Sequence, residues 1–354
     1  MKYLKSVFKQ DNMITGYLYF YVHFITEIVC FFYLSRELGT TSLYVWLIPL
    51  LYDALAFVPQ SLIGAISDKY PKINIGLVGV FLLILAIVFK ILSVNLFIPL
   101  IILCLGNGCL HIEGATTTLT SSKGKLSHSA IFVGGGSFGV ITGRIMAKSS
   151  LNISVLIPLI LTMIPFILLA STYKNRNYYN SICKEFDYQN KHINSKVIVW
   201  LMLFVVIIRG YIGYGIPTSW NKTTYQAVLL YSFMGIGKCL GGILSDAFGI
   251  RKVAMLSTIV AIPFLIFGDN YMTISLIGVM FFSMTMAITL AMLVSVLKRT
   301  PGLAFGITTI GLFLGTLPIF FYKVINNNIN IILIVISSLL CSYIMMKVID
   351  KEGG

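Results

Sequence analysis

The sequence predicts an all-α membrane protein that crosses the bilayer twelve times, and two observations carry this prediction. Of the 354 residues, 57% are hydrophobic and only 11% are charged, whereas about 25% of the residues in a soluble domain are charged. Apolar runs of about 20 residues, the length that spans a bilayer, recur along the whole chain. A single signal or anchor segment therefore does not account for them.

Twelve runs are long enough to cross the membrane, and the short connections between them leave no room for a soluble domain. In chain order we expect them at 14–38, 42–66, 73–92, 95–118, 127–149, 151–172, 196–216, 222–246, 250–268, 270–296, 300–322 and 328–348. The one long polar stretch, STYKNRNYYNSICKEFDYQNKHINSK, separates six runs from six. The predicted organisation is an N-terminal six-helix bundle at 1–172, a cytoplasmic linker at 173–195 and a C-terminal six-helix bundle at 196–354.

The net charge of +14 would suit a nucleic-acid partner, but the positions of the basic residues follow the membrane instead. With the N-terminus inside the cell, 18 of the 26 lysines and arginines fall in expected cytoplasmic segments. The positive-inside rule then places both termini in the cytoplasm. We expect a multi-pass protein of the cell membrane, surrounded by lipid, with no nucleic-acid partner.

A short motif occurs at the same place in both halves. GGILSDAFGIRK ends the eighth run, and a shorter copy, GAISDKYPK, ends the second. An offset of 178 residues carries Gly64 onto Gly242 and Asp68 onto Asp246. Such internal repetition indicates two equivalent halves.

The motif of the second half resembles the loop signature of the major facilitator superfamily, Gly-x-Leu-x-Asp-x-x-Gly-x-Arg-Lys, which joins the second and third helices of each half. The matching residues are Gly242, Leu244, Asp246, Gly249, Arg251 and Lys252. The resemblance implies two bundles that face each other across a central cavity and expose it alternately to the two sides. The stretches GNGCLHIEG and GGGSFGVITG are similar to the fosmidomycin-resistance-like exporter branch.

We expect the two repeated aspartates to hold the cytoplasmic side closed. A carboxylate near a helix N-terminus is stabilised by about 0.3–1 kcal/mol, and by up to about 2 kcal/mol when partly buried. We therefore expect Asp68 to contact the helix start at 300–302 and Asp246 the start at 127–129. Because the second motif is the intact one, Asp246 should contribute more. The expected gate residues are Gly64, Asp68, Gly242, Asp246, Gly249, Arg251 and Lys252.

Six ionisable residues lie within apolar runs, where a charge costs from about 3 to more than 10 kcal/mol. They are Glu27, Asp53, Glu113, Arg144, Arg209 and Lys238. Three acids and three bases are able to neutralise one another, so static pairing is one interpretation and a functional site is the other.

The first run places Tyr19, His23 and Glu27 on one helical face, which we expect to line the cavity. A carboxylate beside an imidazole suits a transported proton, and a static pair of Glu27 with an arginine is the alternative. The residues expected in proton coupling are His23, Glu27, Asp53 and Glu113. Those expected to contact substrate are Tyr19, Asn107, His111, Arg144, Arg209 and Lys238.

No enzyme site, metal site or cofactor is expected. His111 and Glu113 lack the His-Glu-x-x-His spacing of a zinc hydrolase, and five of the six cysteines fall within apolar runs. Gly135, Gly139 and Gly143 predict close helix packing, or, by the family resemblance, an antiporter feature.

The function that fits best is secondary active transport: the proton-coupled export of a small polar or amphiphilic molecule by a monomer. Proton-coupled uptake of a nutrient or anion is the alternative within the same class. A non-transporting membrane sensor or enzyme is the alternative from another class.

Overall fold

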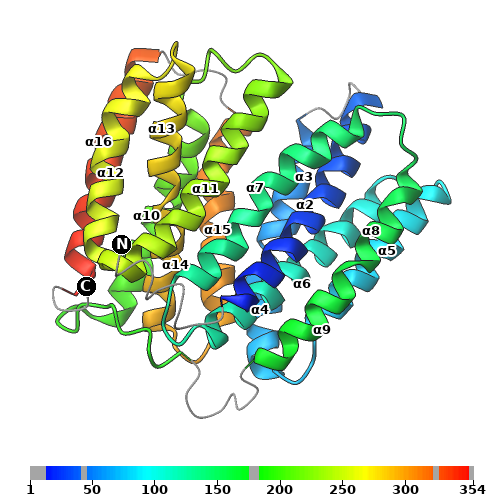
Figure 1. Cartoon of the computed structure of the whole chain (residues 1–354), viewed down its shortest axis with the longest axis horizontal. Helices are drawn as coiled ribbons and strands as arrows, with labels where there is room; N and C mark the ends of the chain where they lie inside the picture. The colour runs from blue at the N-terminus through cyan, green and yellow to red at the C-terminus, as the bar shows by residue number, and fades with distance from the viewer. Residues whose placement is uncertain (1–12, 41–45, 175–182, 322–326, 351–354) are drawn as a thin grey trace.

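The computed structural model describes residues 13–40, 46–174, 183–321 and 327–350, and these parts are almost entirely helical (Figure 1). Within them, 11 helical segments are long and apolar enough to cross a membrane, and Ile75–Ile91 is a shorter apolar helix. The predicted all-α membrane architecture is confirmed.

The first half supplies six crossings. They are α2 (Ile14–Thr40), α3 with α4 (Leu47–Phe57, Gln60–Lys69), α5 (Ile75–Ile91), α6 (Phe97–Ser121), α7 (Ser127–Ala147), and η2 with α8 and α9 (Ile153–Val155, Leu156–Leu161, Met163–Tyr173). The second crossing differs from the expected run at 42–66, because its helix continues to Lys69. Asp68 therefore lies in the last turn of a helix and not in a loop.

The second half supplies six more. They are α10 (Ser195–Gly215), α11 (Thr224–Phe248), α12 (Ile250–Phe267), α13 with α14 (Met272–Ser283, Thr285–Val296), α15 with η3 (Pro301–Thr316, Leu317–Phe320) and α16 (Asn327–Val348). The run expected at 270–296 is interrupted at Met284. Gly249, with φ of 94°, ends α11 and turns the chain directly into α12, a conformation that favours glycine.

Figure 1 shows α2 to α9 in one bundle and α10 to α16 in the other, with the start of α2 and the end of α16 on the same side of the molecule. We call this the termini side and the opposite face the far side. The two bundles meet where α4 packs against α15 and where α11 packs against α7. The 178-residue repeat relates the two members α4 and α11.

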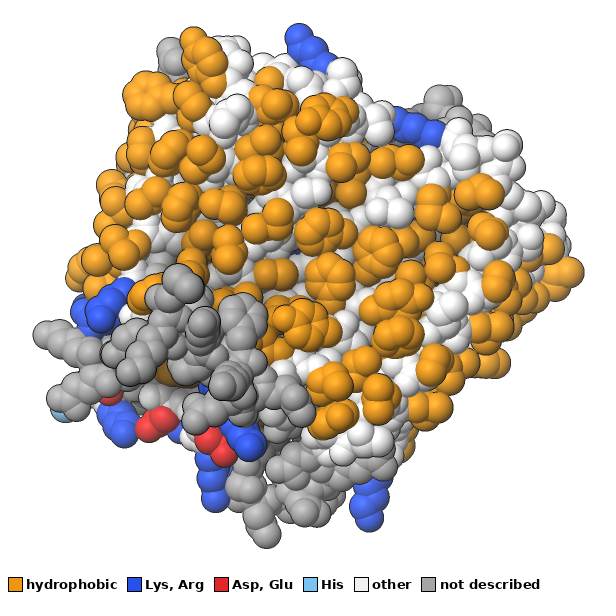
Figure 2. All heavy atoms as spheres, viewed as in Figure 1, with side chains coloured by type: hydrophobic (Ala, Val, Ile, Leu, Met, Phe, Trp, Pro, Cys, Tyr) orange, Lys and Arg blue, Asp and Glu red, His pale blue; other side chains and the backbone are white. Residues whose placement is uncertain are grey.

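Hydrophobic side chains cover most of the visible face between the two ends, and the charged side chains in view gather at those ends (Figure 2). Large apolar side chains such as Leu62, Phe81, Trp200 and Phe267 are more than half exposed. A soluble monomer rarely exposes such a continuous apolar surface, so this belt fits contact with lipid.

Gly135, Gly139 and Gly143 allow α7 to lie directly on α2. A Cβ atom at any of the three would overlap a backbone carbonyl oxygen of α2. Close approach of two helices at small residues is typical of membrane bundles, and these contacts account for the glycine spacing by packing.

We predict that Gly139→Ala destabilises the protein by about 1–3 kcal/mol, the usual cost of forcing extra atoms into a packed core. The new Cβ would also lie 2.7 Å from the Glu27 Cβ. Gly213→Ala is the matched control, because its Cβ has one neighbour, a Phe282 ring carbon at 3.6 Å. Thermal unfolding of both variants in detergent provides the measurement, and equal stabilities would contradict the packing argument.

Candidate functional site

A polar cluster is buried in the first half, where α2 and α6 face each other. It consists of His23 and Glu27 on α2 and Asn107 and His111 on α6, all at most 8% exposed. Each pair is spaced by four residues, so both members lie on one face of their helix. The cluster is therefore built from two pairs of residues, each with a spacing of four, in helices about 80 residues apart in the sequence.

Both histidine rings direct Nδ1 at a backbone carbonyl oxygen. His23 Nδ1 lies 2.9 Å from the Phe132 carbonyl oxygen, and His111 Nδ1 lies 3.0 Å from the Asn107 carbonyl oxygen. A carbonyl oxygen only accepts hydrogen bonds, so each Nδ1 carries a hydrogen, an assignment made from these partners. Both Nε2 atoms then point at each other, 2.8 Å apart.

The Glu27 carboxylate completes this arrangement. Its Oε1 atom lies 3.6 Å from His23 Nε2 and 3.4 Å from His111 Nε2. The Asn107 amide nitrogen, 3.2 Å away, donates to the same oxygen. It also lies 3.2 Å from the Tyr52 hydroxyl, a residue that the sequence did not single out. Two imidazoles and one carboxylate thus converge on a single point.

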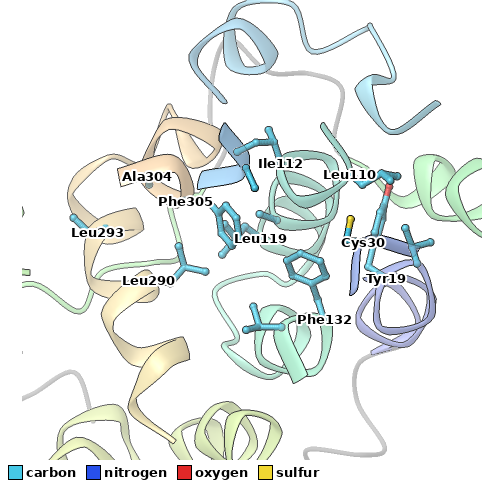
Figure 3. Close-up of a cluster of buried hydrophobic side chains, with 14 of the residues drawn as sticks. Tyr19, Cys30, Leu110, Ile112, Leu119, Phe132, Leu290, Leu293, Ala304 and Phe305 are labelled. Carbon is cyan, nitrogen blue, oxygen red and sulfur yellow. The ribbon is translucent and has the colours of Figure 1, made fainter. Parts of the chain in front are cut away.

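An aromatic layer separates the cluster from the termini side. Phe132 of α7 and Phe305 of α15 point toward one another with Leu119 beside them (Figure 3), and their ring centroids are 6.1 Å apart. The Phe305 ring also lies 6.4 Å from the His111 ring. Because Phe305 belongs to the second half, this layer brings both bundles together next to the cluster.

Lys238 of α11 reaches across from the second half, and its Nζ atom donates to the Ser137 hydroxyl of α7 at 2.9 Å. The preceding residue, Gly136, packs against the His23 ring, so the ammonium group brings a positive charge close to the cluster. The contact places Lys238 where the two halves meet.

Asp53 of α3 is partly buried. Within the part of the chain that the structure describes, its carboxylate has neither a hydrogen-bond nor an ion-pair partner. It is therefore free to exchange a proton or to meet a ligand.

Arg144 lies toward the far side, where its guanidinium stands over the rings of Phe31 at 5.2 Å and Tyr231 at 5.4 Å. With Lys148 it lines a depression of about 280 Å³ between α2, α7 and α11. Both cations are exposed. The depression between the two halves on the far side is thus lined by basic side chains and lies beside aromatic rings.

Three expected site residues lie outside the cluster. Glu113 is fully buried and forms an ion pair of 2.9 Å with Lys174. Arg209 stacks on Phe282 and donates to its carbonyl oxygen within the second half. Tyr19 is fully buried in the core of the first half. The shared face of the first run therefore brings His23 and Glu27, but not Tyr19, to the cluster, and neither arginine pairs with Glu27.

Two matching contacts join the halves on the termini side. Asp68 accepts hydrogen bonds from the backbone N–H groups of Gly302 (2.9 Å) and Leu303 (2.8 Å), and we call this the first latch. In the second latch, Asp246 accepts from those of Leu126 (2.8 Å) and Ser127 (2.9 Å). Both expected contacts with a helix start of the opposite half are confirmed.

The latches have a simple electrostatic basis. Each carboxylate lies in the last turn of its own helix, where the helix dipole disfavours a negative charge, and against the first turn of another helix, where it favours one. Thr300 makes no side-chain cap to α15, so Asp68 supplies that cap from the other half. The two latches have the same number of bonds with equal lengths, so these bonds do not reproduce the larger contribution expected of Asp246.

The remaining gate residues support the latches. A Cβ at Gly64 would overlap the backbone of Gly302, and one at Gly242 would overlap Ala130, so both glycines permit the close crossing. Arg251 donates to the Ile349 carbonyl oxygen at 3.4 Å, and Lys252 is exposed.

Residues 183–190 of the linker form a strap across the termini side. The Tyr188 hydroxyl donates to the Gly124 carbonyl oxygen of the first half at 2.6 Å, and Asp187 pairs with Lys298 of the second half at 2.8 Å. Hydrogen bonds from Lys298 and Lys191 hold the pKa of Asp187 below its ordinary value. The strap contacts both halves, a role that a polar linker sequence did not predict.

No protein-family model matches the sequence, and no curated protein is significantly similar to it. Among solved structures, the chain is similar in fold to the E. coli fucose:proton symporter FucP. The TM-score is 0.61 at 13% sequence identity, over 94% of this chain and 97% of that chain. The chain thus has the fold of a major facilitator transporter.

We predict that Asp68→Asn and Asp246→Asn each weaken closure of the termini side by about 1–2 kcal/mol, because the amide removes the charge and one acceptor oxygen. Spin labels at Lys148 and Lys222, exposed residues of opposite halves, should move closer on the far side. Asp269→Asn is the control, since Asp269 accepts from Ser219 N–H within one half. Unchanged label distances in both latch variants would refute the latch assignment.

We also predict that Lys174→Met lowers the free energy of unfolding by about 3–5 kcal/mol, because it leaves the Glu113 carboxylate buried and unpaired. Adding Glu113→Gln should restore most of the loss. Lys191→Met is the control, because Lys191 is 69% exposed in its pair with Asp187 and such pairs contribute at most about 1 kcal/mol. Denaturant unfolding compares the variants; a loss as small as that of the control would contradict the prediction.

Proposed function

We propose that this protein is a secondary active transporter that exports a small polar or amphiphilic molecule in exchange for protons. The observation that carries the proposal is the pair of latches. Two repeat-related carboxylates, one from each half, each cap a helix of the opposite half on the termini side. Such contacts suit a molecule whose halves rock against each other around a central site.

The termini side is assigned to the cytoplasm because basic residues are concentrated there. Lys69 ends α4, and Lys125, Lys298 and Arg299 belong to connections on that side, as the positive-inside rule requires for a cytoplasmic face. The conformation described is then closed toward the cytoplasm.

The latches favour closure without locking it. A carboxylate at a helix N-terminus is stabilised by about 0.3–1 kcal/mol, and by up to about 2 kcal/mol when partly buried, because water replaces the hydrogen bonds when the halves separate. The two conformations of a transporter must lie within a few kcal/mol of each other for a ligand to shift the balance. Two such latches are compatible with that requirement.

Asp53 is the group that we propose as the proton carrier. Among the residues expected in coupling, Glu113 is engaged by Lys174, and His23 and Glu27 are engaged with His111. Asp53 has no such partner among the described residues. An unpaired charge at this depth costs several kcal/mol, and taking up a proton removes that cost.

The expected substrate contacts also gain support. The side-chain amide oxygen (Oδ1) of Asn107 is buried without a hydrogen-bond partner in the described structure, and Lys238 and Arg144 face the region between the halves. The aromatic neighbours of Arg144 add apolar surface. Together they suit a small molecule with both polar and apolar parts.

Proton-coupled uptake is the second candidate, and the observation in its favour is the fold similarity to a fucose:proton symporter. Uptake and export use the same alternating movement. They differ in whether substrate and proton cross the membrane in the same or in opposite directions.

We predict that the reconstituted protein moves protons against the direction of its substrate. Liposomes containing a pH-sensitive dye would be tested with a panel of cationic, anionic, zwitterionic and neutral small molecules. Asp53→Asn should abolish substrate-driven proton movement and leave substrate exchange intact, while Asp269→Asn should behave as wild type.

The possible outcomes are distinct. Proton and substrate movement in the same direction would establish uptake in place of export. Normal proton movement in Asp53→Asn would remove Asp53 from the coupling role. The absence of any substrate-driven flux across the panel would count against transport itself.

A further inference from the structure

We propose that His23, Glu27 and His111 form a binding site for one divalent transition-metal ion of the zinc, cobalt and nickel class. The inference goes beyond the proposed function, because binding of an ion to the protein in detergent requires no transport. It stands on the positions and orientations of three side chains.

The distances between the donor atoms suit a metal ion. The two Nε2 atoms and the Glu27 carboxylate oxygen all lie within 4.8 Å of one another. Ligands at about 2.0–2.1 Å from a tetrahedral zinc ion are about 3.3–3.4 Å apart. The two sides of the triangle that involve Glu27, at 3.4 and 3.6 Å, already match. The third side, 2.8 Å between the nitrogens, needs to widen by about 0.5 Å, which a small rotation of one ring provides.

The orientation of the rings is that of metal ligands. A histidine that binds a metal through one nitrogen usually donates its other N–H to a backbone carbonyl or a carboxylate, which fixes the tautomer and aims the lone pair. His23 and His111 both donate in this way, to the carbonyl oxygens of Phe132 and Asn107. The Asn107 amide also holds the Glu27 oxygen. The supporting hydrogen bonds are therefore in place around all three donors.

The arrangement requires a cation. With both Nδ1 atoms protonated, the Nε2 lone pairs of neutral histidines face each other and a carboxylate, and nothing in the cluster donates to them. A bound metal ion satisfies all three groups at once. A single shared proton is the competing occupant, and the experiment below distinguishes the two.

The donor set selects the class of ion. Two imidazoles and one carboxylate suit zinc, cobalt and nickel, whereas magnesium and calcium prefer all-oxygen sites. Three protein ligands leave a fourth position for water or for a ligand of the ion. The three residues keep 7–8% of their surface exposed, so the site is not completely sealed.

Lys238 opposes the ion. Its ammonium group comes from the second half and is held next to the cluster by Ser137, so it repels a second positive charge there. Lys238 moves away from the cluster when the halves separate there. The affinity of the cluster for the ion should therefore rise. Substituting Lys238 by an uncharged residue should have the same effect in the conformation described.

The test uses the full-length protein in detergent, purified through a tag without histidine. Cobalt binding would be followed by visible absorption, and zinc binding by calorimetry. We expect one ion per chain. His23→Ala, His111→Ala and Glu27→Gln should each weaken binding at least tenfold, and Lys238→Met should strengthen it.

His192→Ala is the matched control, because His192 is exposed on the termini side and should leave the affinity unchanged. His111→Gln retains a polar side chain without the imidazole nitrogen and should lose binding while the protein stays folded, which thermal unfolding verifies. Wild-type protein that binds neither ion, or cluster variants that bind as tightly as wild type, would overturn the site in favour of a shared proton. Substrate-driven proton flux, measured separately, reports on the proposed function.

Discussion

The structure depends on a carboxylate placed at the unfavourable end of its own helix. Asp68 and Asp246 each occupy the last turn of a helix, where the local dipole repels a negative charge. The compensating N–H groups belong to the opposite half. Neither half is therefore electrostatically complete on the termini side without the other. Three further contacts join the halves near the latches: the glycines at the helix crossings, the aromatic layer and the strap. Together with the latches they close the termini side of the molecule.

Two of the charged groups within the membrane are satisfied inside their own bundle. Glu113 is matched by Lys174 inside the first half, and Arg209 is satisfied by the Phe282 carbonyl oxygen and ring inside the second. These groups stabilise their own bundles. Lys238 instead reaches its hydrogen-bond partner across the boundary between the bundles, and α3, the helix that carries Asp53, packs against α15 of the second half. Ionisable side chains at this boundary change their surroundings when the two bundles move. Such side chains are suited to couple ligand binding to the movement.

The sequence was sufficient for the architecture and for the latches, because both depend on local patterns. Apolar length predicts a crossing, and a repeated motif followed by a recognisable helix start predicts which ends meet. The polar cluster was harder, because its two halves are about 80 residues apart and periodicity reveals a shared face but not what lies opposite it. The pairing of Glu113 with Lys174 was missed for the same reason, since the lysine follows the last apolar residue of its run and resembles a loop residue. Tyr19 shared the expected face but turned into the core, where Phe132 packs edge-on against it.

The aromatic layer has a consequence for leakage. Phe132 and Phe305 pack against the histidines of the polar cluster and lie little more than one turn from the helix starts that the latches cap, so an ion that reaches the cluster from the far side still faces an apolar barrier. Breaking a latch by thermal fluctuation does not by itself create a wet path through the molecule. An open path through the molecule requires both the latches and the aromatic layer to open. For the transport function proposed above, this arrangement would keep protons from leaking through the protein while no substrate is bound.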